Sequence, residues 1–334
     1  MSVVASEKKD FDPLASLRTL LHQDLKGVDQ IIDCNLDSSI SLIPTIGRHL
    51  IYAGGKRLRP LLTIASYRLF EDSGDGAIGL AAAVEFIHTA TLLHDDVIDE
   101  SKLRRGLPTA NDVWGNQASV LVGDFLFARS FQLMIESNNS DVLKILAAAA
   151  ACISEGEVLQ LSLCHNLDVK VEDSLRVIEA KTATLFAAAC QVGALMANQT
   201  AHASALRDYG QNLGMAFQIV DDILDYCANA SRLGKDVGDD FREGKITLPV
   251  ILAYPHCQDD EKEFLRKTLI DHHQTPNDLL RALEILHKRQ GFTKAYDLAA
   301  TYSEKARQAL GPLPAHPIKD LLNGLIDHSL QRGC

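Results

Sequence analysis

Paired cysteines, long apolar runs and a surplus of positive charge are all missing from this sequence. Its seven cysteines are scattered and form no C-x-x-C pair, which favours free thiols in a reducing cytoplasm over a disulfide framework or a zinc site. No stretch of about 18 uninterrupted apolar residues occurs, and the N-terminal residues lack the apolar core of a secretory signal. The net charge of −11 disfavours nucleic acid as a partner, because such a partner demands a basic face. We therefore expect a cytoplasmic protein with no transmembrane segment.

Strand patterns and interdomain linkers are missing as well. Alternating β-branched runs bounded by Asn-Gly or Asp-Gly turns do not occur, which argues against a sheet. Apolar residues instead recur at three- and four-residue spacing in Ala-rich segments, at residues 80–93, 142–163, 177–197 and 204–226. No Pro/Gly/Ser-rich stretch divides the chain. The sequence therefore predicts one large all-α bundle over residues 13–334, preceded by a mobile tail at residues 1–12.

One acidic pattern occurs twice within this helical sequence. Residues 95–99 (DDVID) and 221–225 (DDILD) both read DDxxD, and apolar residues flank each copy. Residues four apart share one face of a helix, so the first and last carboxylates of each motif project together. Like charges at that spacing repel, and a hard cation such as Mg²⁺, which prefers oxygen ligands, removes the repulsion. One copy alone is typical of a solvated acidic face, but two copies among apolar residues predict a metal cluster.

Basic residues cluster at three positions near these motifs. Residues 54–60 (GGKRLRP) combine a flexible backbone with three cations ahead of a helix start, and such a helix entrance binds anions readily. Residues 104–109 (RRGLPT) follow the first acidic motif, and residues 234–245 (GKDVGDDFREGK) follow the second. Each cluster alone is typical of a charged surface. Together with two metal-binding helices, they predict a site for two diphosphates, one joined to the metals and one separate from them.

An allylic diphosphate is a leaving group that such a site can activate. Mg²⁺ and Lys or Arg side chains neutralise the charge that develops as the carbon–oxygen bond breaks, and an apolar cavity shields the carbocation from water. A second diphosphate ester with a double bond can then attack, and the departing diphosphate can accept the proton that is lost. The sequence offers no convincing Ser-His-Asp or Cys-His nucleophile, and this reaction needs none.

Five strings carry a resemblance to a known family: GGKRLRP, FIHTATLLHDDVIDESKLRRGLPTAN, KTA, FQIVDDILDY and GKDVGDDFREGKITLP. Together they resemble the trans-isoprenyl (polyprenyl) diphosphate synthases, and the likeness covers the chain from about residue 40 onward. It implies a helical bundle around a central cavity, three Mg²⁺ ions with substrate bound, and head-to-tail condensation of isopentenyl diphosphate onto an allylic diphosphate. Family members form symmetric dimers, and the apolar helix at residues 120–133 is the candidate face for a homodimer.

The resemblance also implies roles for the acidic residues. Asp95 and Asp99 are expected to ligate two Mg²⁺ ions and Asp221 the third. Asp225 lies on the same face as Asp221 and is either a further metal ligand or a support for one. The residues expected to orient these ligands are Asp96 and Asp222.

The substrate-binding residues implied by the resemblance fall into two groups. The isopentenyl diphosphate site is expected to comprise Lys56, Arg59, His88 and Arg105. The allylic diphosphate is expected to bind Arg104, Lys181, Lys235 and Lys245. Thr182 and Gln218 match positions that stabilise charge near the reacting carbon. Besides the carboxylates at positions 95, 96, 99, 221 and 222, the residues expected to take part in catalysis are Arg104, Lys181 and Lys235.

The helix before the first acidic motif is expected to set the product length. Ala90 and Thr91 lie about one turn before Asp95, and in short-chain family members bulky aromatics occupy these positions. Small residues leave the tunnel floor open, although Phe86 or Phe125 could close it more deeply. The surrounding strings resemble the long-chain synthases that make octaprenyl, solanesyl or decaprenyl diphosphate for quinone tails, from a farnesyl or geranyl diphosphate primer.

Three alternatives remain open. A medium-chain geranylgeranyl or farnesylgeranyl diphosphate synthase would need a deep aromatic floor in the tunnel. A non-catalytic subunit of a heteromeric synthase would have no need of intact Asp and Arg motifs. A helical scaffold protein would leave the paired carboxylates unexplained. For a long-chain product, delivery to a membrane is expected.

Overall fold

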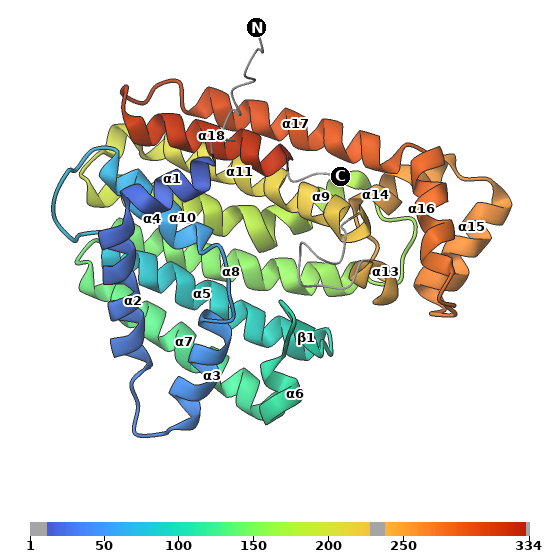
Figure 1. Ribbon diagram of the computed structural model, residues 1–334, viewed down its shortest axis with the longest axis horizontal. Helices are drawn as coiled ribbons and strands as arrows, with labels where there is room; N and C mark the ends of the chain where they lie inside the picture. Colours follow the sequence, from blue (N-terminus) through green and yellow to red (C-terminus); the bar gives the residue numbers. More distant parts are fainter. Residues whose placement is uncertain (1–11, 228–237, 332–334) are drawn as a thin grey trace, which may run out of the picture.

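The computed structural model describes residues 12–227 and 238–331, which are almost entirely helical (Figure 1). The first half contains α1 (Pro13–Leu20), α2 (His22–Leu36), α3 (Leu42–Ile51), α4 (Leu58–Arg68), α5 (Ile78–Ile98), β1 (Leu103–Arg104), β2 (Leu107–Pro108), α6 (Ala110–Trp114), α7 (Asn116–Glu136) and α8 (Ser140–Leu163). The second half contains α9 (Val171–Ile178), the π-helical turn η1 (Glu179–Ala183), α10 (Thr184–Met196), α11 (Thr200–Cys227), α13 (Asp239–Arg242), α14 (Leu248–Ala253), η2 (Tyr254–His256), α15 (Asp259–Leu265), η3 (Arg266–Ile270), α16 (Asp278–Lys288), α17 (Gly291–Ala309) and α18 (Pro317–Gln331).

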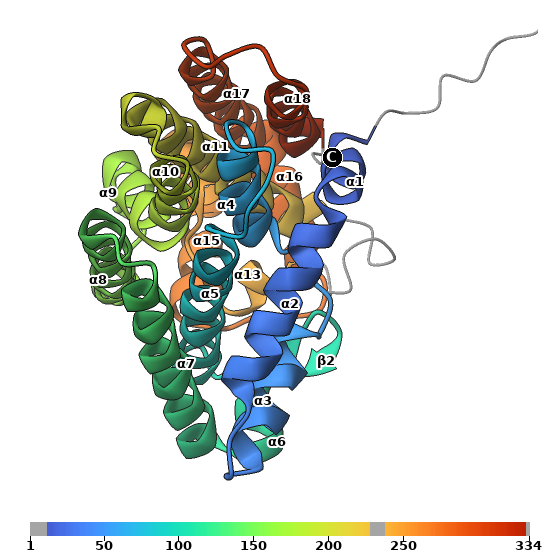
Figure 2. The same cartoon turned by 90° about the vertical axis from the view of Figure 1, so that its left-hand side faces the viewer.

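α5 lies in the middle of the bundle (Figure 2). It packs against α7 on one side and against α2 and α4 on the other. α11 packs against α10 and α17, and α17 and α18 run along one edge of the molecule (Figure 1). Because α8 packs against α10 and η1, the long helices α5, α8, α10 and α11 surround a common interior.

The sequence of α5 explains its central position. The helix is apolar on nearly every side, as expected of a helix that is covered all round. Its fully buried residues include Leu80, Phe86 and Leu93. Glu85 and Asp96 are buried in the same helix, and buried carboxylates need compensating partners. These two residues therefore point to polar or charged partners at two levels of α5, one in its first half and one near its end.

The hydrophobic core has two parts. One surrounds α4, α5 and α10 and contains the first acidic motif at its border. The other surrounds the second half of α11 and the helices α14 to α17. α11 contributes to both, with Leu206 and Leu213 in the first and Ile219 and Val220 in the second. The first acidic motif thus follows helix residues of one cluster, and the second contributes Ile223 and Leu224 to the other.

The all-α prediction is confirmed, with one small exception. Leu103 and Arg104 pair with Pro108 and Leu107 in a two-stranded antiparallel ladder. The turn is made by Arg105 and Gly106, both with positive φ, which is the conformation that tight hairpins need. An Arg-Gly pair is not among the usual hairpin signals, which explains why the sequence did not predict it.

Two further sequence predictions concern the limits of the chain and its membrane-spanning potential. The single domain over residues 13–334 stays a prediction, and residues 1–11 of the predicted tail lie outside the described residues. Residue 12, the last of the predicted tail, is described: Asp12 caps α1 by accepting hydrogen bonds from the amides of Leu14 and Ala15. Within the described part of the chain, α7 is long and apolar enough to cross a membrane by length and composition, and 39% of its apolar window is buried inside the protein.

Candidate active site

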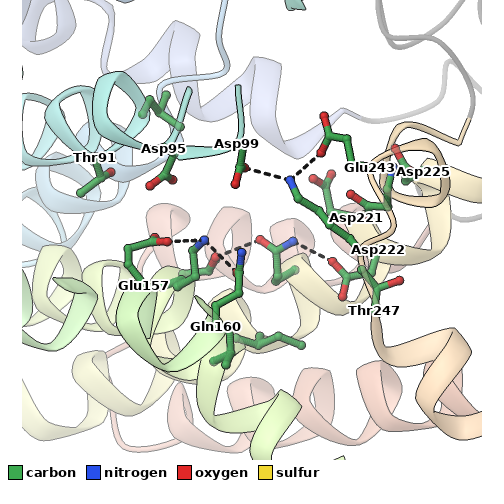
Figure 3. A pocket seen from close by; sticks show the side chains of 18 of the residues that line it. Thr91, Asp95, Asp99, Glu157, Gln160, Asp221, Asp222, Asp225, Glu243 and Thr247 are labelled. Carbon is green, nitrogen blue, oxygen red and sulfur yellow. Dashed lines mark hydrogen bonds and ion pairs between the residues drawn. The ribbon is translucent and has the colours of Figure 1, made fainter. Parts of the chain in front are cut away.

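A cavity of about 1700 Å³ opens between α4, α5, α8, α9 and α11. Its walls carry both acidic motifs and most of the predicted cations, and the segment at residues 240–247 closes one side (Figure 3). The volume exceeds the roughly 300–1,000 Å³ of ordinary ligand pockets. There is therefore room for two substrates at once.

Asp95 and Asp99 face this cavity at the end of α5, and Asp99 is the C-cap of the helix. Asp95 Oδ1 is buried, and no donor from the described residues reaches it. Burial raises the pKa of Asp95 to about 7, and the carboxylates of Glu157 and Asp99 add to the rise while Lys181 opposes it. The positive charges of Lys181 and Arg104 therefore do not outweigh the effect of burial on this carboxylate.

Asp96 lies on another face of α5 and does not line the cavity. It is fully buried, and its carboxylate accepts hydrogen bonds from Arg104 Nε at 2.8 and 3.1 Å and an ion-pair contact from Nη2 at 2.7 Å. Such bidentate pairs fix the orientation of the guanidinium. Asp96 therefore acts on the cavity through Arg104, which is part of its wall.

The second acidic motif faces the same cavity from α11. Asp221, Asp222 and Asp225 all line it. Burial raises the pKa of Asp222 well above its usual range, and the negative charge of the nearby Asp240 raises it further. Asp225 Oδ2 accepts a hydrogen bond from the Asp240 amide at 2.9 Å. This bond anchors the segment that carries Lys245.

Lys245 joins the two halves of the site. Its Nζ lies 2.9 Å from Asp99 Oδ2 and 2.7 Å from Glu243 Oε2 (Figure 3). Burial by itself lowers the pKa of Lys245, but the carboxylates of Asp99, Asp240 and Glu243 outweigh it and raise the pKa. Lys245 is therefore a firmly charged cation between the motifs.

Two predicted residues lie in the π-helical turn η1. π-turns inside helices are rare and cluster at functional sites, because the extra residue re-aims side chains. Here the turn directs Lys181 and Thr182 to the cavity. α8 approaches it closely at Gly156, where a Cβ would lie only 2.6 Å from the Cβ of Ala180. Any side chain at Gly156 would push η1 away.

Glu157 and Gln160 of α8 are functional candidates that the sequence prediction missed. Lys181 Nζ lies 2.7 Å from Glu157 Oε2 and donates to Gln160 Oε1 at 2.9 Å (Figure 3). Both residues line the cavity. The signal was present as polar residues on either side of a glycine, followed by Gln160, after the Ala-rich stretch of the helix.

A chain of hydrogen bonds connects Thr182 to the second acidic motif. Thr182 Oγ1 donates to Gln218 Oε1 at 2.9 Å, and Gln218 Nε2 donates to Asp222 Oδ1 at 2.8 Å. The carboxylate thereby determines which end of the Gln218 amide faces Thr182. Asp222 therefore orients this pair in addition to lining the cavity.

A second group of cations lines the cavity on the side of α4. It comprises Lys56, Arg57, Arg59 and Arg105 together with His88. Arg59 Nη1 lies 3.1 Å from His88 Nε2, and burial lowers the pKa of Arg59 to about 10. Gly55 lets the Arg105 guanidinium approach, since a Cβ there would lie 2.6 Å from Arg105 Nη1. These cations line the same cavity as Lys181 and Lys245, and their separation into two substrate sites stays a prediction.

The predicted chain-length residues differ in position. Thr91 lines the cavity and donates to the carbonyl of His88 at 2.8 Å. Ala90 and Phe86 are fully buried within the packing around α5. Phe125 lies on α7, half-buried, with the Arg129 guanidinium 5.1 Å from its ring centre. Lys235 lies outside the described residues.

The donor set of the cavity fits a divalent cation. Carboxylates from α5 and α11 face the same space, and Asp95 Oδ1 lacks any partner in the described chain. A hard cation is bound by such oxygens. No cluster of three His, Cys, Asp or Glu within the described ranges is close enough to hold a metal by itself.

Comparisons with known proteins agree with this geometry. A family model described as polyprenyl synthetase matches residues 40–286. The octaprenyl diphosphate synthase of Escherichia coli (strain K12) is 42% identical over 320 residues, covering 96% of this chain and 99% of that one. The crystal structure of a decaprenyl diphosphate synthase from Rhodobacter capsulatus matches with a TM-score of 0.91 at 47% identity, covering 96% and 100% of the two chains.

A further solved structure bears on the metal and the substrate. The polyprenyl synthase of Caulobacter crescentus CB15, complexed with calcium and isoprenyl diphosphate, matches with a TM-score of 0.92 at 48% identity, covering 96% of this chain and 98% of that one. Geranylgeranyl synthases of known structure match at 28–30% identity, although one curated geranylgeranyl synthase reaches 40% over 275 residues. Long-chain synthases are thus favoured over geranylgeranyl synthases. The chain belongs to the polyprenyl synthetase family, which uses a divalent metal, and is a trans-prenyltransferase.

Proposed function

We propose that this enzyme extends a farnesyl or geranyl diphosphate primer head to tail with isopentenyl diphosphate to an octaprenyl, solanesyl or decaprenyl product, the precursor of a quinone side chain. The observation that carries this proposal is the pair of carboxylate motifs facing one cavity that holds two separate cation groups. Relatives named as octaprenyl and decaprenyl synthases, at 42–47% identity over nearly the whole chain, support the product class.

The allylic diphosphate is proposed to bind beside the acidic motifs. Asp95, Asp99 and Asp221, with Asp225 as a further candidate, would hold three Mg²⁺ ions. Bound Mg²⁺ supplies neutralisation of the charge that grows on the leaving diphosphate. Lys181 and Lys245 are cations on the same side of the cavity, and Arg104 is oriented toward it by Asp96. We assign Lys235 to this group from the sequence alone.

Isopentenyl diphosphate is proposed to bind at the α4 side. Lys56, Arg59 and Arg105 provide charge, and His88 provides a ring nitrogen beside Arg59. Holding both substrates in one cavity converts a bimolecular reaction into an effectively unimolecular one. The double bond then attacks the allylic carbon, and the departing diphosphate removes the proton.

Thr182 and Gln218 are proposed to stabilise the allylic cation. Their side chains form a part-buried, hydrogen-bonded pair, which Asp222 keeps in one orientation. Fixed dipoles aimed at a developing charge need no reorganisation during the reaction. Phe186 and Phe217 also line the cavity, and such apolar walls keep water from the cation.

A homodimer is proposed through α7 and α8. They expose large apolar side chains that do not line the cavity, including Leu121, Ile135 and Val158. Exposed apolar side chains, where they gather into a patch, mark an interaction surface, and two copies of one patch can meet across a two-fold axis. A dimer face on α7 would explain the apolar composition of this helix as well as a membrane-spanning role would.

The deciding experiment is an incubation of the purified protein with Mg²⁺, isopentenyl diphosphate and farnesyl diphosphate, with the products sized by chromatography. The proposal expects a product of eight to ten isoprene units, as in the named relatives. Geranylgeranyl or farnesylgeranyl diphosphate as the final product would instead support the medium-chain alternative. No product from an intact, folded dimer would support a non-catalytic subunit.

A further inference from the structure

Glu85 is a buried carboxylate in the cationic part of the cavity, where the proposed function requires an anion to bind. It lies on α5, one turn before His88, and only 6% of its surface is exposed. It lines the cavity together with Arg57, Arg59 and Arg105. A carboxylate at this position repels a diphosphate. Its presence therefore requires a physical reason.

Two polar atoms at this position are buried and unsatisfied. Within residues 12–227 and 238–331, neither Glu85 Oε2 nor Arg59 Nε has a hydrogen-bond partner. Arg59 is otherwise held by His88 and by the face of Phe186, whose centre lies 4.7 Å from the guanidinium carbon. Buried charges without hydrogen bonds are costly. A phosphate oxygen could satisfy Arg59 Nε, but it could accept from Glu85 only if that carboxyl carried a proton.

The charges around Glu85 come from several elements. Arg57 and Arg59 stand at the entrance of α4, and Arg105 stands at the turn between β1 and β2. α2 contributes Asp29, which forms an ion pair with Arg57, whereas α10 contributes the apolar ring of Phe186. Burial raises the pKa of Glu85, and the three arginines reduce this rise without cancelling it.

His88 is the other titratable group at this position. Burial, followed by the charges of Arg59 and Arg105, lowers its pKa well below the usual range. This side of the cavity is therefore lined by three arginines and Lys56, a neutral imidazole and the carboxyl of Glu85, with Asp29 paired to Arg57 outside the cavity. Glu85 is the acid that can balance these cations before a substrate arrives.

We propose that Glu85 is the internal counterion of this site, which balances the arginines while the site is empty and takes up a proton when a diphosphate binds. The inference rests on the proposed function, because the headgroup of isopentenyl diphosphate is the anion. One proton from solvent adds to the Glu85 carboxylate, and the resulting hydroxyl can donate to a phosphate oxygen. No other bond changes.

The pH dependence follows from the sign of this coupling. The bound anion makes the pKa of Glu85 higher in the complex than in the free enzyme, so the complex holds more protons. Binding is then favoured at low pH and weakens as the pH rises through the pKa of the complex. A side chain that cannot titrate removes this dependence.

The test is calorimetry of isopentenyl diphosphate binding to the metal-free, full-length enzyme, in buffers of different ionisation enthalpy, from about pH 6.5 to about pH 9. We expect the wild type to take up protons on binding and to bind several-fold more weakly at the upper end. Glu85→Gln keeps the shape and hydrogen-bonding capacity. It should take up fewer protons, depend less on pH and bind several-fold more tightly than wild type at the upper end.

Two control variants separate Glu85 from its neighbours. His88→Gln removes the second titratable group and should retain the Glu85 share of proton uptake. Asp29→Asn removes a carboxylate that pairs with Arg57 but does not line the cavity, and should retain wild-type proton uptake. Loss of proton uptake in His88→Gln, with wild-type uptake in Glu85→Gln, would overturn the proposal.

Different results would contradict the proposed isopentenyl diphosphate site and the proposed role of Glu85. Failure of the wild type to bind isopentenyl diphosphate, or equal binding by Arg59→Ala, contradicts the proposed function of this side of the cavity. Arg59-dependent binding by the wild type without any proton uptake across the range contradicts the role of Glu85 alone. This second result comes from the wild type, so it does not depend on whether Glu85→Gln folds.

Discussion

Lys245 Nζ lies 2.9 Å from Asp99 Oδ2, although the two residues are 146 positions apart in the chain. Asp99 ends the first acidic motif, and Lys245 follows the second, so one ion pair connects the two walls of the cavity (Figure 3). Lys245 thus forms an ion pair with the carboxylate that is proposed to bind Mg²⁺. Metal binding at Asp99 should therefore free Lys245 for the leaving diphosphate.

Replacing Lys245 by Ala should lower kcat by about 100-fold or more, because charge on the leaving group grows as the bond breaks. The KM for isopentenyl diphosphate should change little, since that substrate binds on the other side of the cavity. Steady-state kinetics with each substrate varied would measure both effects. Lys144→Ala, at an exposed lysine of α8, is the control and should retain wild-type turnover. A larger change in the KM for isopentenyl diphosphate than in kcat would contradict the assignment of Lys245.

Metal binding should depend on pH through Asp95. Burial, with Glu157 and Asp99, raises its pKa to about 7, and a proton must leave before the carboxylate can bind a cation. Mn²⁺ affinity, measured by calorimetry on the enzyme with bound diphosphate, should fall as the pH drops below about 7. Asp95→Asn should bind Mn²⁺ more weakly at every pH. Affinity that stays constant between about pH 6 and about pH 8 would contradict this role.

The same pKa has a consequence for stability without metal. A carboxyl with a raised folded-state pKa contributes stability at low pH, and this contribution is lost as the pH rises from the unfolded value of about 3.9 to about 7. Asp95→Asn carries no such charge and should therefore have a higher Tm than wild type at about pH 8. Thermal unfolding followed by circular dichroism in chelator would check the sign. A lower Tm for the variant would show that the carboxylate stabilises the metal-free fold.

Arg59 should serve isopentenyl diphosphate and not the leaving group. It is half-buried on the α4 side and held by His88 at 3.1 Å, so Arg59→Ala should mainly raise the KM for this substrate, by about tenfold or more. Lys181→Ala is the matched variant on the other side and should mainly depress kcat. Indistinguishable effects of the two variants on both substrates would contradict the two-site division.

Thr91→Phe should shorten the product to about geranylgeranyl diphosphate. Thr91 lines the cavity one turn before Asp95, and an aromatic ring there would obstruct the growing chain, at a typical cost of about 1–3 kcal/mol per misfit. Product sizing by chromatography gives the answer. Ala90→Phe is the comparison: Ala90 is fully buried, so this change should destabilise the packing around α5 as well. A full-length product from a folded Thr91→Phe variant would show that this face does not line the path.

Introducing charged residues on the proposed α7–α8 dimer face should prevent dimerisation. Leu121 and Ile135 are 67% and 63% exposed in the single chain, and the double change to Lys would put four like charges at a two-fold interface. Light scattering should report a dimer for wild type and a monomer for the variant. Leu280→Lys, at another exposed leucine, should leave the dimer intact. A wild-type monomer at micromolar concentration would refute the dimer.

Local sequence determined the helical class and most of the candidate site. Apolar spacing predicts α5 and α11, because helix periodicity is a property of neighbouring residues. DDxxD spacing likewise brings Asp95 and Asp99 together without knowledge of the fold. The predicted helix at residues 120–133 lies within α7. The assignment of each cation to one of two groups came from the family resemblance and stays a prediction.

Only the tertiary structure decided which partner each charged group meets. Asp96 and Asp95 are neighbours in the chain, yet one is paired with Arg104 in the interior and the other faces the cavity. Glu85, Glu157 and Gln160 lie in ordinary helical sequence, and they became candidates because α8 and α5 bring them beside Lys181 and the arginines. Charge pairing depends on distance and burial, which local periodicity does not encode. The chemistry of the motifs was therefore readable from the chain, whereas their electrostatic environment was a product of packing.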